Sequence, residues 1–299
     1  MEISKNLKYF FILPAVLSVL SLTAIGLWGL KPGIDLSGGT LMQVTYQGVP
    51  PTAAQVQGVL SPISVGEARV QPTGTQGYSI RTRSLSDTEH QEVGQALATL
   101  GNVHEDEFAS VGPTIGSELL HKGLIALGLV IVCMILFIAF AFRAVSKPVA
   151  SWKYGVVAII TLAHDVLIPT GLFAFLGYYN GAEVDSLFIV GLLTILGISI
   201  NDTIVVFDRI RENLAHNEAA HRHEDFSVVV GRSIMQTLAR SINTSLTVII
   251  VLAALWLSGP VATKDFALTL IVGMIAGTYS SIFLASPLLV AWERWQKKA

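Results

Sequence analysis

The hydrophobic positions of the chain fall into six long runs separated by polar stretches. A helix needs about 20 residues to cross the ~30 Å hydrocarbon core of a bilayer, and the runs are close to this length or longer. The pattern therefore predicts six transmembrane helices. The runs are 9–29, 124–142, 155–177, 186–207, 242–257 and 266–291.

The first run follows Lys5 and Lys8 and has some features of a secretory signal peptide. It is longer than the usual apolar core of such a peptide, and no small-residue cleavage site follows it. We therefore expect a retained anchor, with residues 1–30 forming a cytoplasmic amino terminus and the first transmembrane helix.

One long polar insertion, residues 31–121, carries the pattern of a small α+β domain. Met42, Val44 and Tyr46 alternate with polar residues, as in a half-buried strand. Ser86 and Glu89 form a capping-box pattern that opens a helix. We expect strand 42–46, helix 52–60, strand 67–71, a turn at 72–74, strand 78–83, helix 86–100 and strand 103–111. This β-α-β-β-α-β order is typical of a ferredoxin-like domain.

Composition and loop charge refine this topology. The chain is 52% hydrophobic and 13% charged, which excludes an ordinary soluble domain. Cytoplasmic loops of membrane proteins are rich in Lys and Arg, whereas loop 178–185 has neither and loop 259–265 has only Lys264. Both termini are therefore expected in the cytoplasm, with residues 31–121 on the opposite side and residues 122–299 forming helices two to six.

The basic residues themselves are accounted for by this topology, so we expect no nucleic-acid partner. They lie before the first run, in the second and fourth loops, and in the tail. They are Lys5, Lys8, Arg143, Lys147, Lys153, Arg209, Arg211, Arg222, Arg232, Arg240, Arg294, Lys297 and Lys298. A net charge of −2 gives no further indication of a partner.

Polar residues inside the fourth run mark a candidate functional stripe. Asp202 would lie roughly 8 Å deep at ~1.5 Å per residue, where an aspartate costs about 2.5–3.5 kcal/mol on insertion scales. The stripe occupies about 120° of the helical wheel. Its members are Thr194, Asn201, Asp202, Asp208 and Arg209. The alternative is an aspartate near a helix end that simply reaches the headgroups.

The third run carries His164 and Asp165 near its middle, and both are costly in lipid. Pro169 removes the helical hydrogen bond to the carbonyl of Asp165. The pair is either a relay near Asp202 or a buried structural pair. An intramembrane aspartyl protease is disfavoured because no Gly-x-Gly-Asp motif surrounds either aspartate.

The fifth run opens with a polar face that contains Arg240, Asn243, Thr244 and Thr247 at helical spacing. This face could meet the stripe of the fourth run, pairing Arg240 with Asp202 or Asp208. Alternatively, Arg240 is an anchor at the membrane interface. In the sixth run, Gly273-x-x-x-Gly277 allows close approach to another helix, in this chain or in a partner.

Glycine-rich motifs flank the α+β insertion, and each is a candidate hinge. The first contains Gly33, Asp35, Gly38 and Gly39, and the second contains Gly112, Pro113 and Gly116. The first is not a phosphate-binding P-loop, because no Lys-Ser/Thr follows it. His221-x-His223 lacks the further ligands of a metal site, so we expect no metal.

The sequence GISINDTIVVFDRIREN (residues 197–213) closely resembles the fourth transmembrane segment of SecF, in the SecD/SecF family of protein-export membrane proteins. GIDLSGG (33–39) and VGPTIGSEL (111–119) resemble the motifs on either side of the family's outer domain. The resemblance covers nearly the whole chain and implies half of a resistance-nodulation-division (RND) transporter, with SecD as the other half.

The resemblance also implies a function and partners. Asp202, with Asn201 beside it, would belong to a path for a monovalent cation, a proton or sodium ion, and Arg240 would be functional. Cation flow would drive motion of the outer domain and promote movement of unfolded preprotein through the SecYEG channel. The family location is the bacterial inner membrane, and no cofactor is implied.

Two other functions remain open from the residues alone. The same fold could export a small lipophilic substrate as half of an RND transporter, or the chain could be a structural anchor without an ion path. No nucleotide-binding motif is present, so we do not expect an enzyme. A buried ionisable face favours ion coupling over the anchor.

Overall fold

The computed structural model describes residues 3–141 and 149–298, and the chain divides into two compact units. The helical unit contains the chain up to Lys31, Ile125–Glu183 and the chain from Leu187 onward. The α+β unit contains Pro32–Leu124 together with Val184–Ser186. The predicted end of the second run at 142, and the loop residues Arg143 and Lys147, lie outside the described residues.

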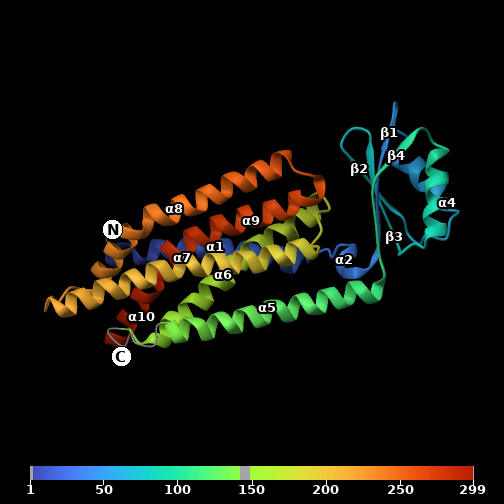
Figure 1. Cartoon of the computed structure of the whole chain (residues 1–299). Coiled ribbons are helices and arrows are strands. Elements are labelled where there is room, and N and C mark those ends of the chain that lie inside the picture. Colours follow the sequence, from blue (N-terminus) through green and yellow to red (C-terminus); the bar gives the residue numbers. More distant parts are fainter. Residues whose placement is uncertain (1–2, 142–148, 299) are drawn as a thin grey trace. The chain divides into compact units, whose positions relative to one another are not determined.

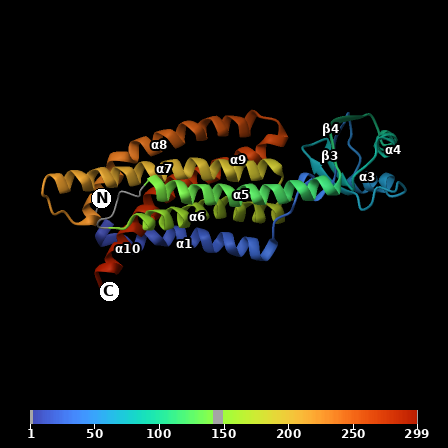
Figure 2. The ribbon, with the colours of Figure 1, turned by 60° about the horizontal axis from the view of Figure 1, so that its bottom comes forward.

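Six helices in the described part of the chain are long and apolar enough to cross a membrane, which confirms the prediction from hydropathy (Figure 1). Both views place the start of the first helix and the end of the last at the same end of the helical unit (Figure 2). The bounds are α1 (Ile3–Trp28), α5 (Pro113–Ala141), α6 (Ser151–Tyr179), α7 (Ser186–Ala219), α8 (Phe226–Ser258) and α9 (Val261–Ser280), which continues through a π-helical turn, η1 (Ser281–Ala285), into α10 (Ser286–Lys298).

Several helices continue beyond their apolar runs, and α7 shows why. Past the predicted end at 207, Ile210 is fully buried and keeps one face of the helix packed. On the exposed face, Arg211 pairs with Asp208 and Arg209 with Glu212, each at 2.6 Å and three residues apart. Such pairs support a helix after its apolar stretch has ended.

Small residues bring the helices of the helical unit into close contact. A Cβ atom at Gly273 of α9 would lie 2.1 Å from Ile195 Cδ1 of α7, and one at Gly277 would lie 3.0 Å from Ser199 Cβ. The Gly-x-x-x-Gly pattern of the sixth run therefore serves packing within this chain. α1 and α6 meet in the same way, since a Cβ at Gly171 would lie 2.3 Å from Ser21 Cβ.

The π-helical turn η1 precedes Pro287 at the start of α10. A proline ring clashes with the carbonyl four residues earlier, here that of Phe283, and this favours a wider turn. Ser286 Oγ donates to the carbonyl of Ser281 at 3.2 Å, across five residues. Ser280 and Ser281, at the start of the wide turn, are both fully buried.

The α+β unit has the predicted β-α-β-β-α-β order, with one additional short helix, α2, before the first strand. Its antiparallel sheet has the strand order β2-β3-β1-β4, which is that of a ferredoxin-like domain. The bounds are α2 (Ile34–Ser37), β1 (Gly39–Tyr46), α3 (Ala53–Leu60), β2 (Arg69–Thr73), β3 (Gly77–Thr82), α4 (Asp87–Ala98) and β4 (Val103–Val111).

The unit has its own hydrophobic core between the sheet and the two longer helices. The alternating residues of β1 are buried as predicted, and Tyr46 Oη donates to the carbonyl of Leu97 at 3.2 Å. Burial of each large apolar side chain stabilises the domain by about 1.5–3 kcal/mol. The core contains Met42, Val44, Tyr46, Val56, Leu60, Val65, Tyr78, Ile80, Leu85, Val93 and Leu97.

β2 extends through Pro72, where the sequence predicts a turn. Proline has no N–H to donate within a sheet, but β2 is an edge strand that pairs with β3 alone in this sheet, and an edge strand tolerates this loss.

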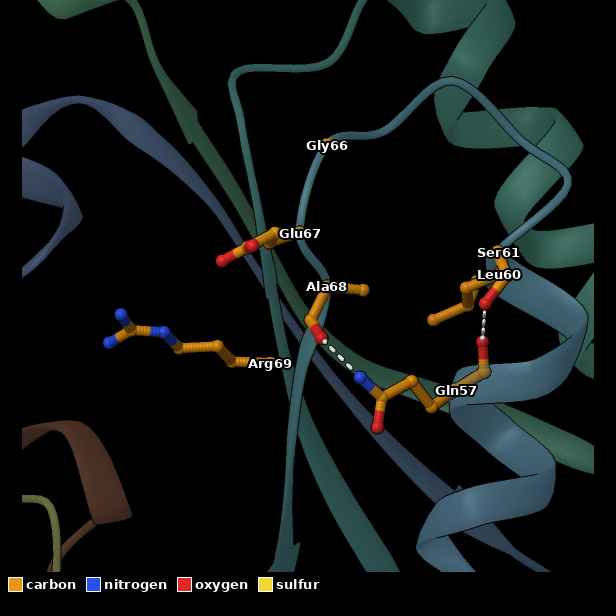
Figure 3. Close-up of a pocket in the computed structure, with 7 residues that line it drawn as sticks. All are labelled: Gln57, Leu60, Ser61, Gly66, Glu67, Ala68 and Arg69. Carbon is orange, nitrogen blue, oxygen red and sulfur yellow. Dashed lines mark hydrogen bonds between the residues drawn. The ribbon is translucent and has the colours of Figure 1, made fainter.

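Beside β2, Gln57 Nε2 donates to the carbonyl of Ala68 at 3.3 Å. An open pocket of about 500 Å³ lies here (Figure 3). Its lining residues are Gln57, Leu60, Ser61, Gly66, Glu67, Ala68 and Arg69.

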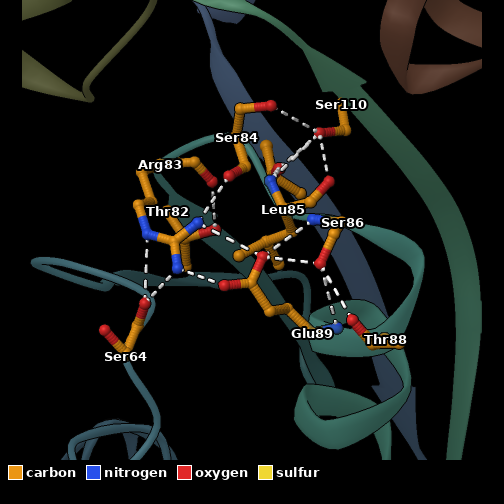
Figure 4. A network of polar contacts seen from close by, with 10 residues as sticks. Ser64, Thr82, Arg83, Ser84, Leu85, Ser86, Thr88, Glu89 and Ser110 are labelled. Carbon is orange, nitrogen blue, oxygen red and sulfur yellow. Dashed lines mark hydrogen bonds and ion pairs between the residues drawn. The ribbon is translucent and has the colours of Figure 1, made fainter.

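A polar network joins the loop after α3 to the start of α4 (Figure 4). Arg83 Nε donates to the carbonyl of Ser64 at 3.0 Å, and its Nη2 forms an ion pair with Glu89. Glu89 also accepts from the backbone N–H of Ser86 at 2.9 Å, which completes the predicted capping box. The Arg83 guanidinium and the Ser86 donors lower the pKa of Glu89 from 4.5 to about 2.

We predict a pH dependence of this loop from the lowered pKa. Because the pKa of Glu89 is lower in the folded chain, the stabilisation is present above pH 4.5 and is lost as the pH falls towards about 2. Amide exchange of residues 61–66 in the full-length protein, corrected for intrinsic rates, should accelerate across this window. In the Glu89→Gln variant these amides should exchange fast at every pH in this window. Glu92 is exposed on the same helix, and the Glu92→Gln variant should show the wild-type pH dependence. Equal pH dependence in Glu89→Gln and wild type would contradict the assignment.

Candidate functional site

The carboxylate of Asp202 lies between α7, α8 and the end of α9. Ser241 Oγ of α8 donates to its Oδ1 at 2.5 Å, and Ser281 Oγ donates to its Oδ2 at 2.6 Å. Each carboxylate oxygen therefore has a hydroxyl donor, as a partly buried carboxylate requires. Asp202 is an interior site residue, and the headgroup alternative does not describe its contacts.

A small cavity of about 10 Å³ lies beside Asp202, where α7 and α9 approach closely at Gly273 and Gly277. Thr278 Oγ1 donates to Ser245 Oγ at 2.5 Å in its wall. This volume is near the minimum of about 10–15 Å³ that one water molecule needs. The cavity is polar on one side, so it can accept a single water or a small cation next to the carboxylate.

A second carboxylate, that of Asp165 on α6, is completely buried. Its Oδ2 accepts hydrogen bonds from Ser280 Oγ, at 2.9 Å, and from Ser199 Oγ of α7. Its Oδ1 lies 3.0 Å from His164 Nδ1. His164 is 5% exposed, and among the described residues its buried Nε2 has no hydrogen-bond partner.

Serine residues connect the two carboxylates. Ser280 bonds to Asp165 and the next residue, Ser281, bonds to Asp202. Ser199, which also bonds to Asp165, stands one helical turn before Asp202 on α7. Two carboxylates and one imidazole in a buried hydroxyl network can hold and exchange protons or bind a small cation.

Other residues of the predicted ion-coupling set are not in this network. Arg240 and Asn201 are exposed in the described chain, and no ion pair joins Arg240 to Asp202 or Asp208 among the described residues. The expected pairing is therefore absent from this structure, because Ser241, rather than Arg240, faces α7. Asn243 and Thr244 are also exposed, with Thr244 Oγ1 donating to the carbonyl of Arg240 at 2.8 Å.

The remaining members of the predicted stripe lie away from Asp202. Thr194 is bonded to its own helix, through the carbonyl of Val190 at 2.8 Å. Asp208 is exposed and pairs with Arg211. Arg209 Nε donates to Gln236 Oε1 at 2.8 Å and thereby links α7 to α8.

The residues that sequence reasoning missed are the hydroxyl donors. Ser280 and Ser281 stand three and four residues after Gly277, and this position next to the close-approach motif is the signal that could have identified them. Ser199 precedes Asp202 by three residues, a spacing that places both on one helix face. The donors are Ser199, Ser241, Ser280 and Ser281.

The two glycine motifs pack against each other in the α+β unit. A Cβ atom at Gly38 would lie 2.5 Å from Pro113 Cα, and one at Gly116 would lie 2.5 Å from the backbone nitrogen of Gly38. Gly38 also has a φ of 77°, which favours glycine. The motifs thus form a close backbone contact rather than two free linkers.

Four further predicted residues complete this region. Gly33 N–H donates to the carbonyl of Val184 at 2.8 Å, and Asp35 Oδ2 accepts from the N–H of Ser186, the first residue of α7, at 3.4 Å. Gly39 opens β1, and Gly112 separates β4 from α5, which begins with Pro113. Within the described residues, no group of three or more His, Cys, Asp or Glu side chains forms a metal site.

Family models match most of the chain. The model described as protein export membrane protein SecD/SecF, C-terminal, matches residues 92–295, and the SecD/SecF GG motif matches residues 29–48. The protein translocase subunit SecF of Thermobaculum terrenum is 42% identical, covering 96% of this chain and 92% of that protein. The subunit of Anaerolinea thermophila is 38% identical, covering 95% and 91%.

Solved structures show the same fold. The crystal structure of SecDF, a translocon-associated membrane protein from Thermus thermophilus, matches with a TM-score of 0.81 and 32% identity over 98% of this chain. SecDF in its super-membrane-facing form matches with a TM-score of 0.69. This chain spans 39% of each SecDF chain. The chain belongs to the SecF family of protein translocase subunits, which are multi-pass membrane proteins of transport.

Proposed function

We propose that the chain couples the flow of a monovalent cation to the translocation of unfolded preprotein through SecYEG, with Asp202 as the carboxylate that binds the cation. The observation that carries this proposal is the environment of Asp202. The carboxylate is partly buried among three helices, and its hydrogen-bond partners in the described chain are two serine hydroxyls. Binding of a proton or sodium ion would neutralise the Asp202 carboxylate and so remove the free-energy cost of a charged side chain within the membrane.

Movement could follow from the same contacts. Protonation of Asp202 would convert one oxygen from an acceptor to a donor, so Ser241 or Ser281 would have to turn its own hydroxyl. These serines hold α8 and α9 against α7, and a change in their bonds would alter the helix spacing. α7 begins at Ser186, which donates to Asp35 of the glycine motif. We propose that motion of α7 is passed to the α+β domain by this route.

An exposed polar face supports a partner of the SecD type. Arg240 directly precedes Ser241, which bonds to Asp202, so Arg240 lies at nearly the same level along the helices. A charged group at this level is costly in lipid unless another chain or water covers it. SecD would cover this face and complete the RND-type transporter. The face contains Asn201, Arg240, Asn243 and Thr244.

Orientation in the membrane is tested by labelling. We propose cytoplasmic termini and an extracytoplasmic α+β domain, because loops rich in Lys and Arg alternate along the chain with loops that contain few of these residues, and the rich loops of membrane proteins lie in the cytoplasm. In a Cys133→Ser background, an impermeant maleimide added to spheroplasts should label Asp87→Cys but not Glu218→Cys. Permeabilised cells should show labelling of both. Labelling of both residues from one side in intact spheroplasts would refute the six-span topology.

The role of Asp202 is tested by Asp202→Asn. The carboxamide keeps the shape and can still bond to Ser241 and Ser281, but it cannot ionise. We expect a folded, SecD-associated protein that has lost the stimulation of export by an ion gradient, while the ATP-driven part survives. The measurement is preprotein uptake into membrane vesicles with and without an imposed gradient.

Asp208→Asn is the matched control for this experiment. Asp208 stands on the same helix but is exposed and pairs with Arg211, so its gradient response should equal that of wild type. If Asp202→Asn also responds to the gradient as wild type does, Asp202 is structural and the coupling proposal is wrong.

Arg240 is tested by comparing lysine and alanine. No ion pair joins Arg240 to a carboxylate in the described chain, so the partner that we propose for it is a carboxylate of the SecD-type chain that covers this face. A guanidinium can bind such a carboxylate through two parallel hydrogen bonds, whereas an ammonium acts as a point charge. We therefore expect Arg240→Lys to recover only part of the gradient-driven export that Arg240→Ala loses. Full export by both variants would identify Arg240 as an interface anchor.

A further inference from the structure

The His164–Asp165 pair is more deeply buried than Asp202, and the proposed cation path through Asp202 does not use it. Asp165 is fully buried and His164 is 5% exposed. No charged residue stands between Tyr9 and Trp28 of α1, which packs on α6. The titratable neighbours are Tyr279 of α9, whose ring lies 5.8 Å from that of His164, and Asp202 of α7, reached through the serines.

The hydrogen bonds of the pair leave one position open. If His164 is neutral and donates from Nδ1 to Asp165, its Nε2 carries a lone pair that accepts no hydrogen bond from the described residues. Tyr279 Oη is likewise buried with no hydrogen-bond partner in the described chain. Buried polar atoms are nearly always satisfied, so two such atoms on neighbouring rings mark a position where a further polar species can bind.

The open position has the chemistry of a proton acceptor. The lone pair of a neutral imidazole nitrogen accepts a proton, whereas sodium, a hard cation, prefers oxygen ligands. Both lone pairs of Asp165 Oδ2 already accept hydrogen bonds, one from Ser199 and one from Ser280. The ligand of this pair is therefore a proton rather than a metal cation.

We propose that His164 and Asp165 form a second proton-binding site, which exchanges occupancy with Asp202 through Ser280 and Ser281. The inference rests on the proposed role of Asp202 as the first site. Consecutive serines bond to the two carboxylates, so a change in the hydrogen bond at one carboxylate acts on the same stretch of helix that carries the donor of the other.

The step is balanced in atoms and charge. A hydronium ion transfers a proton to His164 Nε2 and leaves as water. The proton on Nδ1 passes to Asp165 Oδ1, so the imidazole stays neutral and the carboxylate becomes a neutral acid. Asp165 Oδ1–H then donates to His164 Nδ1, and Oδ2, now the carbonyl oxygen of a neutral acid, accepts more weakly from Ser199 and Ser280. Loss of the proton reverses each change.

Infrared difference spectroscopy tests the second site directly. The full chain with SecD, reconstituted in lipid, is measured before and after a pH change. We expect two carboxylic-acid C=O bands in wild type. Asp165→Asn should lose the band of Asp165 and shift the band of Asp202. Asp202→Asn should lose the band of Asp202. His164→Gln should lose the imidazole signal and shift the Asp165 band, which tests the site should Asp165→Asn fail to fold.

Thr161→Val is the matched control, because Thr161 is buried one turn before Asp165 and, within the described residues, its hydroxyl donates to the carbonyl of Val157 and not to the carboxylate. It should keep both bands. Two unchanged bands in Asp165→Asn, or an unchanged Asp165 band in His164→Gln, would overturn the second site. Suppose that Asp202→Asn loses gradient-driven export, whereas Asp165→Asn retains both the export and the two C=O bands. The proposal of a second site is then wrong, and the role proposed for Asp202 stands. If Asp202→Asn keeps the gradient response, the function proposed for Asp202 fails.

Discussion

The structure of the helical unit depends on one constraint: two carboxylates buried among apolar helices must each receive hydrogen-bond donors from the protein. The donors are hydroxyls with short reach, so the helices that carry them must approach closely. Gly273 and Gly277 permit this approach between α9 and α7. The packing of small residues between α9 and α7 and the polar network are therefore two parts of one arrangement.

Hydropathy and local signals were sufficient for much of the fold. The six helices, the alternating strand at Met42, Val44 and Tyr46, and the capping box of Ser86 and Glu89 all depend on spacing along the chain, and each is present. β2 differed at Pro72 because the position of a strand at the edge of a sheet is a property of the assembled sheet. A sequence window does not contain that information.

The site was predictable only in part, for a related physical reason. An ionisable residue in an apolar run stands out, so Asp202, His164 and Asp165 were recognisable. Their serine donors did not stand out, because a serine in a transmembrane helix also serves as a small packing residue. The choice between Arg240 and Ser241 as the residue facing Asp202 depends on the rotation of α8, which the long-range packing of the helices determines.

The wide turn η1 lets the last membrane helix hold one more residue than a regular α-helix would hold over the same length. A π-helical turn contains one more residue than the α-helical turn that it replaces, so the helix on either side keeps its rotational phase. Deletion of a single residue within Ser281–Ala285 would therefore restore regular α-helix and leave Leu289 and Val290 in the core that they now fill. An evolving chain can gain or lose one residue at this turn without turning the packed face of α10 away from its neighbours.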